Sequence, residues 1–546
     1  MQNHSMSSSE QKNPEPVAET SPGFCWLRIG GAALSGGLGI LSFPIFGRPY
    51  QLDLLVFLIL LPLMLVAQGI GKKRGFVLGG ICGLTFVGVS FSWVCHTINE
   101  FTGMGTLLSL LVYLFWVAYE AVPWAVMGLA MGRCRNSLHL LLVLPLWVGI
   151  EHYYPRLWPW HLGGALYDRT WFLQCVDILG ASGLTALVFL TSATAAGIVG
   201  WRRSVEGFPR WRVAASAVLL LVCCVYGPLR LGSIQARLAE REGERIEVGF
   251  IQGFLHPNER RQRPDENPRE YYLRLRQLLD GYVAETRLLI GEEKPSAVGL
   301  VLWPEGSNPI SLATGQGVDP WRSPLFNRPA GGKMVLDDFK IPMVIGGFGE
   351  GRYNISIYLR RDGVGSIYKK NHPVPFGEWV PGLDLLPDSW RNKLPGIGNL
   401  NLGTDNPPMS LGDSTFRNLI CYEAVLPEYM RQSSIGSDFL VNLTEDYWYG
   451  NTAHIEQHRS VLILRAVESR IPVLRCTNVG PSGIIDLAGE FHGGKKIWEA
   501  DSFRESFIPG SAPSFYRSWG HWFAFLCLLA GVLELFSGRW RAARRA

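Results

Sequence analysis

Three short segments hold residue types that together could carry out acyl transfer. Glu305 follows a Trp-Pro pair, Lys370 ends a Tyr-Lys-Lys run, and Cys421 precedes a Tyr-Glu pair. A thiol is mostly protonated near neutral pH, so a cysteine nucleophile needs a base within hydrogen-bond reach and a cation that favours the thiolate. Glu305 suits the base and Lys370 the cation. The Lys370 ammonium and the backbone N–H of Tyr422 could also stabilise an oxyanion, which predicts acyl transfer through a thioester.

Each of these residues also has an ordinary explanation when it is taken alone. A glutamate after proline is commonly a solvated turn residue, a lysine after lysine lies on a surface, and a cysteine that closes a strand lies in a core. Cys421 and Cys476 are the two cysteines between residues 233 and 512. In an oxidising compartment they could form a disulfide. The neighbouring Glu305 and Lys370 instead favour a free Cys421, with Cys476 as a buried strand residue.

The elements that must position these residues follow from the pattern of residues 233–512. Short β-branched runs alternate with longer amphipathic ones, as in a layered α/β fold. Two site residues are expected where strands end, which places them on a rigid scaffold. The predicted strands are 246–252, 297–303, 342–347, 354–359, 365–369, 416–421, 439–442, 472–476 and 483–486, and the predicted helices are 269–291 and 453–470.

The chain as a whole is too apolar for an ordinary soluble protein. Of its 546 residues, 47% are hydrophobic and 18% are charged. Residues 26–232 contain about seven apolar runs of membrane-spanning length, and residues 513–537 contain one more. Residues 1–25 are expected to be a disordered cytoplasmic tail and residues 538–546 a basic cytoplasmic tail. A net charge of only +5 gives little support for nucleic-acid binding. The predicted runs are 26–46, 52–70, 75–95, 105–131, 138–152, 176–200, 213–231 and 518–536.

The distribution of basic residues predicts the topology. Lysine and arginine are concentrated in the second, fourth and sixth loops between the runs and in the C-terminal tail, so these segments should face the cytoplasm. The domain over 233–512 should then lie on the opposite side of the membrane. The basic residues of the three loops are Lys72, Lys73, Arg74, Arg133, Arg135, Arg202, Arg203, Arg210 and Arg212.

Five short segments of the chain resemble those of a known protein family. IQGFLHPNER (251–260), WPE (303–305), YKKNHPVPFGE (368–378), CYE (421–423) and WYG (448–450) are similar to the apolipoprotein N-acyltransferase family of the nitrilase superfamily. The resemblance implies an αββα sandwich joined to a polytopic membrane domain of about eight transmembrane helices. It implies that Glu305 is the general base, Lys370 the oxyanion stabiliser and Cys421 the nucleophile. It assigns supporting roles to Glu378, Tyr422, Glu423 and Trp448.

The resemblance also implies a reaction and a location. An acyl chain would pass from a phospholipid to Cys421, and then to the α-amino group of the diacylglyceryl-cysteine that begins an apolipoprotein. No cofactor is implied. The protein would be a multi-pass protein of the bacterial inner membrane with its catalytic domain in the periplasm. The chain departs from the family pattern at Pro373 and over 442–447, which bears on acyl-chain or acceptor preference.

Two other functions remain open from the residues alone. A membrane-tethered amidase would use the same three residues with water as the acceptor. A transporter or receptor could use the domain only to bind a ligand.

Several further features are ambiguous in the sequence. The apolar insert over 379–390 could be a lid at the membrane interface or a packed surface loop. Glu120 lies within an apolar run and should face a cavity or a partner. Glu120 and His161 could lie near a lipid path or be structural. His454 and His458 are four residues apart but lack the glutamate of a zinc motif, so a polar helix face without metal is expected.

Overall fold

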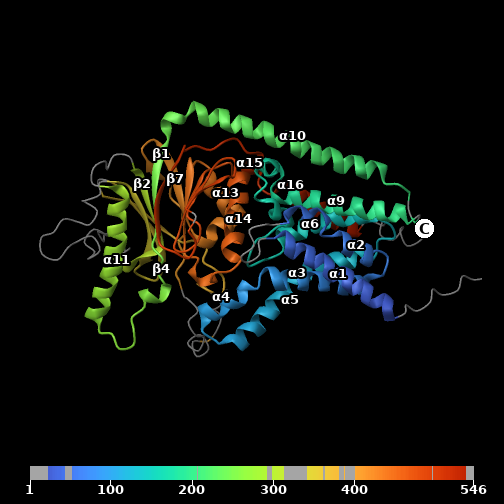
Figure 1. Cartoon of the computed structure of the whole chain (residues 1–546), viewed down its shortest axis with the longest axis horizontal. Coiled ribbons are helices and arrows are strands. Elements are labelled where there is room, and N and C mark those ends of the chain that lie inside the picture. Colours follow the sequence, from blue (N-terminus) through green and yellow to red (C-terminus); the bar gives the residue numbers. More distant parts are fainter. Residues whose placement is uncertain are drawn as a thin grey trace, which may run out of the picture.

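The computed structural model combines a helical region with a two-sheet sandwich (Figure 1). It describes residues 22–43, 52–203, 205, 207–291, 298–312, 341–360, 363–379, 387, 400–494 and 496–536. The expected tail over 1–25 lies outside these residues except for its last four, which begin a helix. The basic tail over 538–546 lies outside them altogether.

Every predicted apolar run contains helix. Among the residues that the structure describes, three helices are long and apolar enough to cross a membrane, namely α5 (Thr106–Met131), α9 (Ala181–Arg202) and α10 (Arg210–Glu240). Helices α3 (Lys72–Ser90) and α4 (Trp93–Thr102) together would form a fourth span bent by 59°. Asp53–Ala67, Thr170–Leu179 and Trp522–Glu534 are shorter apolar helical segments. The main helices of this region are α1 (Pro22–Ser42), α2 (Leu61–Ala67), α3 (Lys72–Ser90), α4 (Trp93–Thr102), α5 (Thr106–Met131), α6 (Val143–Tyr153), α7 (Thr170–Leu173), α8 (Val176–Leu179), α9 (Ala181–Arg202), α10 (Arg210–Glu240), α15 (Phe515–Trp519) and α16 (Trp522–Phe536).

Glycines let α3 and α5 pack backbone to backbone. A Cβ atom at Gly79 would lie 2.2 Å from the carbonyl oxygen of Trp124, and one at Gly128 would lie 2.3 Å from that of Gly75. Small residues at such contacts are the usual means of helix association in an apolar environment, where burial of apolar surface gives no driving force. This packing fixes α3, and with it the short helix α4 that continues towards the sandwich.

The sandwich consists of two six-stranded sheets. One sheet has the strand order β12-β1-β2-β3-β4-β5 and the other β11-β10-β9-β8-β7-β6. Strands β1 to β3 are parallel to one another, as are β7 to β9. The strands are β1 (Ile246–Gln252), β2 (Val298–Leu312), β3 (Met343–Gly349), β4 (Tyr353–Arg360), β5 (Gly363–Lys369), β6 (Met409–Leu411), β7 (Ser414–Ile420), β8 (Phe439–Thr444), β9 (Val473–Thr477), β10 (Gly483–Ile485), β11 (Phe491–Gly493) and β12 (Asp501–Phe507).

Helices cover the outer faces of both sheets and complete the αββα order. Helix α11 (Pro268–Ile290) packs on the first sheet, and α13 (Pro427–Ser434) and α14 (His454–Ser469) cover the second sheet on the side of the helical region (Figure 1). Phe250 and Phe439 contribute to the apolar layer between the sheets. The outer side of α14 shares an apolar cluster with the helical region, so the two parts have a continuous core.

The predicted strands and both predicted helices are present, with ends shifted by a few residues, but three strands and α13 were not predicted. Strands β6 and β11 have only three residues each, too few to show a period of two. Strand β12 is rich in charge, yet it pairs antiparallel with β1 along its whole length and forms the edge of the first sheet. Strand β2 continues well past the predicted end at residue 303.

Specific polar contacts join the sandwich to the helices. Arg470 donates to the carboxylate of Asp177 at 2.8 Å, and the indole N–H of Trp93 donates to Gln457 at 2.9 Å. The hydroxyl of Tyr422, the residue after the candidate nucleophile, donates to the backbone oxygen of Leu157 at 2.7 Å. The candidate site therefore lies where the sandwich contacts the helical region.

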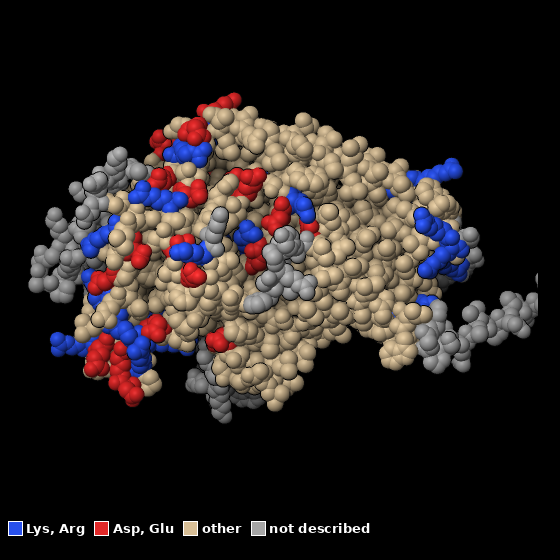
Figure 2. All heavy atoms as spheres, in the orientation of Figure 1, with Lys and Arg blue, Asp and Glu red and all other residues tan. Residues whose placement is uncertain are grey.

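Charged side chains are unevenly distributed over the face of the molecule that Figure 2 shows. They are dense over the sandwich, sparse over the belt of helices, and basic at the end farthest from the sandwich (Figure 2). The basic loops meet at one end of the bundle. The N–H of Gly71 donates to the carbonyl of Gly132 at 2.9 Å, and Arg212 donates to the hydroxyl of Ser137 at 2.8 Å.

Candidate active site

Cys421 lies at a strained turn directly after β7. The strand ends at Ile420, one residue earlier than predicted, and Cys421 begins a 3-10 turn that continues to Val425. Its φ angle of 52° lies in the left-handed region, which a residue with a side chain adopts only at a cost. Such a turn between a strand and a helical segment points a nucleophile away from the sheet. The thiol is free, and so is that of Cys476, which is buried on β9.

Glu305 lies within β2, and the prediction that it follows the strand is wrong. The strand bulges here, because the register with β3 shifts between Trp303 and Asn308, and Gly306 has a φ angle of 67°. The bulge turns the carboxylate of Glu305 into the site. One oxygen accepts a hydrogen bond from the amide of Asn354 at 2.6 Å, and the other accepts from the backbone N–H of Glu445 at 2.8 Å. Both contacts fix the carboxylate for proton transfer.

Lys370 directly follows β5 and lies between two carboxylates. Its Nζ atom is 3.3 Å from Glu305 and 2.7 Å from Glu378. Glu378 also accepts from the backbone N–H of Val374 at 2.7 Å. Burial lowers the pKa of Lys370, but the charges of Glu305 and Glu378 raise it by more, so the net pKa lies above its usual range. The side chain is therefore a permanent ammonium.

The surroundings of Cys421 raise the pKa of its thiol and so favour the protonated form. Burial raises its pKa well above the usual range and the charge of Glu305 adds to this, while the charge of Lys370 lowers it. The charge of Lys370 therefore acts in the predicted direction, towards the thiolate. Burial and Glu305 outweigh the single ammonium because a low dielectric disfavours any charged sulfur. The thiol must lose its proton during the reaction, and Glu305 is the base available for that step.

Glu423 holds the segment that follows Lys370. Its carboxylate accepts hydrogen bonds from the hydroxyl of Tyr368 at 2.6 Å and from the backbone N–H groups of Asn371 at 2.6 Å, His372 at 2.9 Å and Ile420 at 2.7 Å. Burial raises its pKa to about 7, against the opposing effect of these donors. One side chain thereby connects the turn at Cys421 to the turn after Lys370.

Trp448 contacts the helical region. Its ring stacks on that of Phe101 at the end of α4, with a centroid distance of 4.7 Å and an interplanar angle of 21°. The Phe101 ring also lies next to Gly377, the neighbour of Glu378. Most of the predicted lid over 379–390 lies outside the described residues, with only positions 379 and 387 inside them.

Asn354 and Glu445 belong to the site but were not predicted from the sequence, although the sequence contains a signal for Asn354. Asn354 also lies 3.4 Å from Glu378, so it contacts both carboxylates around Lys370. It is a polar residue at a buried position of β4, where an apolar residue would be usual. Glu445 is held by Arg260 at 3.2 Å and Asn478 at 2.9 Å, and burial raises its pKa to about 7. Its contact with Glu305 is made by its backbone N–H group. The residue type at this position therefore gives no sign of the contact.

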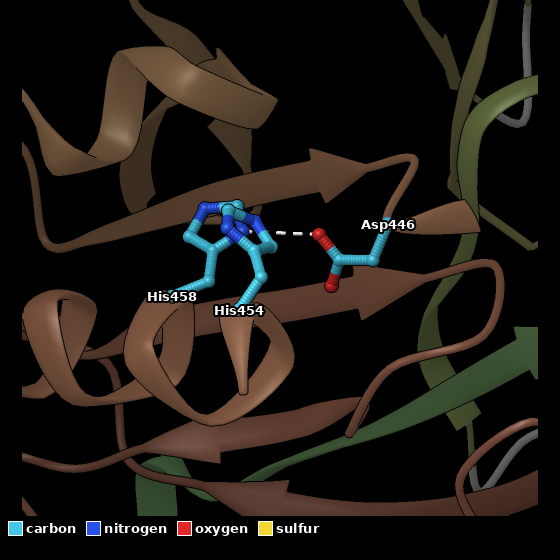
Figure 3. A group of neighbouring side chains, drawn as sticks. All are labelled: Asp446, His454 and His458. Carbon is cyan, nitrogen blue, oxygen red and sulfur yellow. Dashed lines mark hydrogen bonds and ion pairs between the residues drawn. The ribbon is translucent and has the colours of Figure 1, made fainter. Parts of the chain in front are cut away.

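His454 and His458 do not form a polar helix face, because both are fully buried against the sandwich. With Asp446 they form a group whose spacing could hold a metal ion (Figure 3). The carboxylate of Asp446, however, already accepts from the guanidinium of Arg475 at 2.5 Å and lies 3.0 Å from Nδ1 of His458. The adjacent guanidinium repels a divalent cation in a buried site, so the residues present do not fit a metal ion.

Glu120 and His161 both have charged partners, which was expected for Glu120. Glu120 lies 3.5 Å from the guanidinium of Arg156, and His161 lies 3.1 Å from the carboxylate of Glu151. Arg156 stacks over the ring of Trp160 at 3.9 Å. Its neighbour Leu157 accepts the hydrogen bond from Tyr422, so this group of buried charges adjoins the site.

Comparison with known proteins assigns the family. A family model described as the apolipoprotein N-acyltransferase N-terminal domain matches residues 35–194, and one described as carbon-nitrogen hydrolase matches residues 277–501. The chain is 30% identical to an apolipoprotein N-acyltransferase of Geobacter metallireducens over 92% of this chain and 93% of the relative. The chain belongs to the apolipoprotein N-acyltransferase family. A second apolipoprotein N-acyltransferase, from Gloeobacter violaceus, is 26% identical over 94% of this chain and 95% of the relative.

Solved structures of the superfamily are more distant. Nit3 of Saccharomyces cerevisiae, of branch 10 of the nitrilase superfamily, is 16% identical and covers 49% of this chain and 90% of its own, with a TM-score of 0.33. A carbon-nitrogen hydrolase of Helicobacter pylori is 13% identical over 48% of this chain and 89% of its own, also with a TM-score of 0.33. As a member of the apolipoprotein N-acyltransferase family, the chain is a membrane protein with an enzyme domain of the carbon-nitrogen hydrolase superfamily.

Proposed function

We propose that the protein transfers an acyl chain from a phospholipid to Cys421 and then to the α-amino group of the diacylglyceryl-cysteine at the start of an apolipoprotein. The observation that carries the proposal is the buried thiol of Cys421, whose pKa responds to the charges of both Glu305 and Lys370. These two side chains are themselves in contact at 3.3 Å. The family assignment supplies the substrate class.

The first half-reaction forms the thioester. The sulfur of Cys421 attacks the ester carbonyl of the phospholipid while the carboxylate of Glu305 takes the thiol proton. The ammonium of Lys370 and the backbone N–H of Tyr422 stabilise the oxyanion. The intermediate collapses by breaking the bond to the glycerol oxygen, which takes the proton from Glu305 and leaves as the lysophospholipid.

The second half-reaction uses the same residues, and the acyl group now leaves the sulfur of Cys421. The neutral amine of the acceptor attacks the thioester carbonyl, and Glu305 takes a proton from the nitrogen. The carbon–sulfur bond breaks, the amide is released, and the proton returns from Glu305 to Cys421. Glu378 and Glu423 support this site because they hold Lys370 and the turn after it. No cofactor takes part in the proposed reaction.

The proposed setting is the bacterial inner membrane, with the catalytic domain over 233–512 in the periplasm. Eight transmembrane helices would come from residues 26–232 and 513–537, with tails over 1–25 and 538–546 in the cytoplasm. The uncharged belt over the helices and the basic end farthest from the sandwich support this orientation (Figure 2). The proposed boundary at residue 232 falls within α10, which continues to Glu240.

The proposed lipid route runs from the helices to Cys421 along α4. Drawing an acyl chain through water costs about 0.8 kcal/mol for each CH₂ group, so the thiol must be reached from an apolar surface. The stacked rings of Phe101 and Trp448 lie where such a route would pass. The insert over 379–390 is the proposed lid, since it directly follows Glu378 and carries tryptophans at both ends.

Intact-mass measurement after exposure to phospholipid tests the proposal. The wild-type protein in detergent should gain one acyl group, and a diacylglyceryl-cysteine peptide should remove it and yield an N-acylated peptide. The Cys421→Ala protein should gain none. Failure of every phospholipid tried to acylate folded wild-type protein would exclude the transferase.

The same experiment separates the two alternatives. A membrane-tethered amidase would release the acyl group to water without the peptide and would accept a simple amide as donor. A transporter or receptor would keep its function in the Cys421→Ala protein.

A further inference from the structure

Arg475 is a fully buried arginine that contacts neither Cys421 nor Glu305 directly. It lies on β9, opposite Asn442 of β8 in the parallel register. Its neighbours Leu474 and Cys476 point into the layer between the sheets, so the alternation of the strand directs Arg475 towards α14. A buried guanidinium is costly unless it is paired, and the partners of Arg475 lead to both parts of the site.

The first set of contacts leads to the nucleophile. One arm of the guanidinium donates to the side-chain oxygen of Asn442 at 3.0 Å. The amide nitrogen of Asn442 in turn donates to the backbone oxygens of Leu419 at 3.3 Å and Cys421 at 3.4 Å. Because Arg475 occupies the oxygen of Asn442, the amide is oriented with its nitrogen towards these carbonyls. The strained turn at Cys421 is therefore held from the side of β8.

The second set of contacts leads to the base. The other arm donates to Asp446 at 2.5 Å, and the second oxygen of Asp446 lies 3.0 Å from Nδ1 of His458. Figure 3 shows the Asp446 carboxylate pointing at the two imidazole rings of α14. Asp446 directly follows Glu445, whose backbone N–H donates to Glu305 at 2.8 Å. Fixing Asp446 from two sides thus fixes the N–H group that orients the base.

We propose that Arg475 is a positioning residue that sets the nucleophile Cys421 and the base Glu305 relative to each other, through Asn442 on one arm and Asp446 on the other. A planar fork with two separated donor pairs suits this task, whereas the ammonium of a lysine offers one point of charge. The Cys421 thiol has to lose its proton during the reaction, so the relative placement of the base matters for the rate. The inference rests on the proposed function of Cys421 and Glu305.

The test compares three single variants. Arg475→Lys keeps the charge but removes the fork. Asn442→Asp keeps an oxygen for the guanidinium but cannot donate to the carbonyls of Leu419 and Cys421. Arg465→Lys is the matched control, because Arg465 is also a fully buried arginine with a carboxylate partner, at 2.5 Å from Glu468. Among the residues that the structure describes, its hydrogen bond and ion pair are made with Glu468 and not with the site.

Acylation rates are measured for each folded variant with phospholipid in detergent and referred to the amount of folded protein. We expect Arg475→Lys and Asn442→Asp to lower the acylation rate constant about tenfold to a hundredfold, the scale of a small misplacement of reacting groups, with little change in KM. The pH profile of acylation should also shift, which loss of stability alone would not cause. Arg465→Lys should lower the melting temperature and leave the rate and the profile unchanged.

A second measurement keeps the inference separate from the proposed function. The pH dependence of Cys421 alkylation by iodoacetamide should move towards that of an ordinary thiol in Arg475→Lys and Asn442→Asp, but not in Arg465→Lys. If wild-type protein forms no acyl-enzyme, the proposed function fails and alkylation alone decides the positioning role. Wild-type acylation and alkylation profiles in folded Arg475→Lys would overturn the inference. If that variant does not fold, the same profiles in Asn442→Asp would overturn it.

Discussion

The ammonium of Lys370 lies 2.7 Å from the carboxylate of Glu378, closer than the 3.3 Å that separates it from the base Glu305. One cation between two carboxylates leaves a net negative charge beside the thiol of Cys421. This negative charge adds to the effect of burial in raising the pKa of the thiol. The arrangement also gives Glu378 a role in holding the oxyanion stabiliser in place.

Replacing Glu378 by glutamine should impair acylation of Cys421. The neutral amide cannot hold the ammonium of Lys370 as firmly, so we expect the acylation rate constant to fall about a hundredfold, the scale of one misplaced oxyanion donor. Single-turnover mass measurements with phospholipid provide the rate. Glu499→Gln, at an exposed glutamate of the same domain, should retain the wild-type rate. An unimpaired Glu378→Gln protein would show that Lys370 needs only Glu305.

Glu305 and Lys370 should have opposite effects on the titration of Cys421. The charge of Glu305 raises the pKa of the thiol and that of Lys370 lowers it. At a fixed pH below the pKa, we therefore expect alkylation of Cys421 to be about tenfold faster in Glu305→Gln and slower in Lys370→Met, because each pKa unit is a factor of ten in thiolate.

Both variants should be inactive in acyl transfer. In Glu305→Gln the thiol should therefore be alkylated faster although acyl transfer is lost. The Cys421→Ser protein gives the background from other thiols. Slower alkylation of Glu305→Gln than of wild type across the pH range would contradict the electrostatic account.

Glu423 should make the stability of the protein depend on pH. Its pKa is raised by burial from 4.5 to about 7 in the folded protein. Between these values the folded state holds a proton that the unfolded chain has lost, so the free energy of unfolding falls as pH rises from about 4.5 to about 7. In Glu423→Gln this part of the decline should be missing from melting curves recorded against pH.

Glu428 provides the control of opposite sign. Its hydrogen bond to Arg431 lowers its pKa, so it stabilises the folded state above its usual pKa and loses this effect as pH falls. Glu428→Gln should therefore leave the decline between about 4.5 and about 7 intact. A Glu423→Gln protein with the wild-type decline would show that another group is responsible.

Phe101 should affect the use of the lipid substrate more than the chemistry. Stacking between aromatic rings contributes about 0.5 to 1.5 kcal/mol beyond area burial, which corresponds to a factor of about two to twelve. We expect Phe101→Ala to raise KM for the phospholipid by such a factor, because α4 loses its contact with Trp448.

Phe115→Ala on α5 is the matched control, since this ring is 77% exposed on the helical region. KM for phospholipids of different chain lengths is the measurement. Equal KM values in the two variants would argue against a lipid route along α4.

Much of the catalytic domain follows from local sequence pattern. Strand β1 was predicted to the residue, and most other predicted strands and both helices are shifted by only a few positions, because alternation and helical periodicity are local properties. Strand β12 escaped prediction because its pairing with β1 spans more than two hundred residues of chain, and its charged residues hide any alternation. The bulge in β2 was likewise decided by pairing with β3.

The sequence by itself determined which chemistry is available: one cysteine, one glutamate and one lysine in contexts typical of a known family. Only the tertiary structure decided their state. The burial of Cys421, the second carboxylate on Lys370 and the buried positions of His454 and His458 depend on contacts between distant segments. The pKa of a group depends on its solvation and on neighbouring charges in space, and neither is fixed by the residues next to it in the chain.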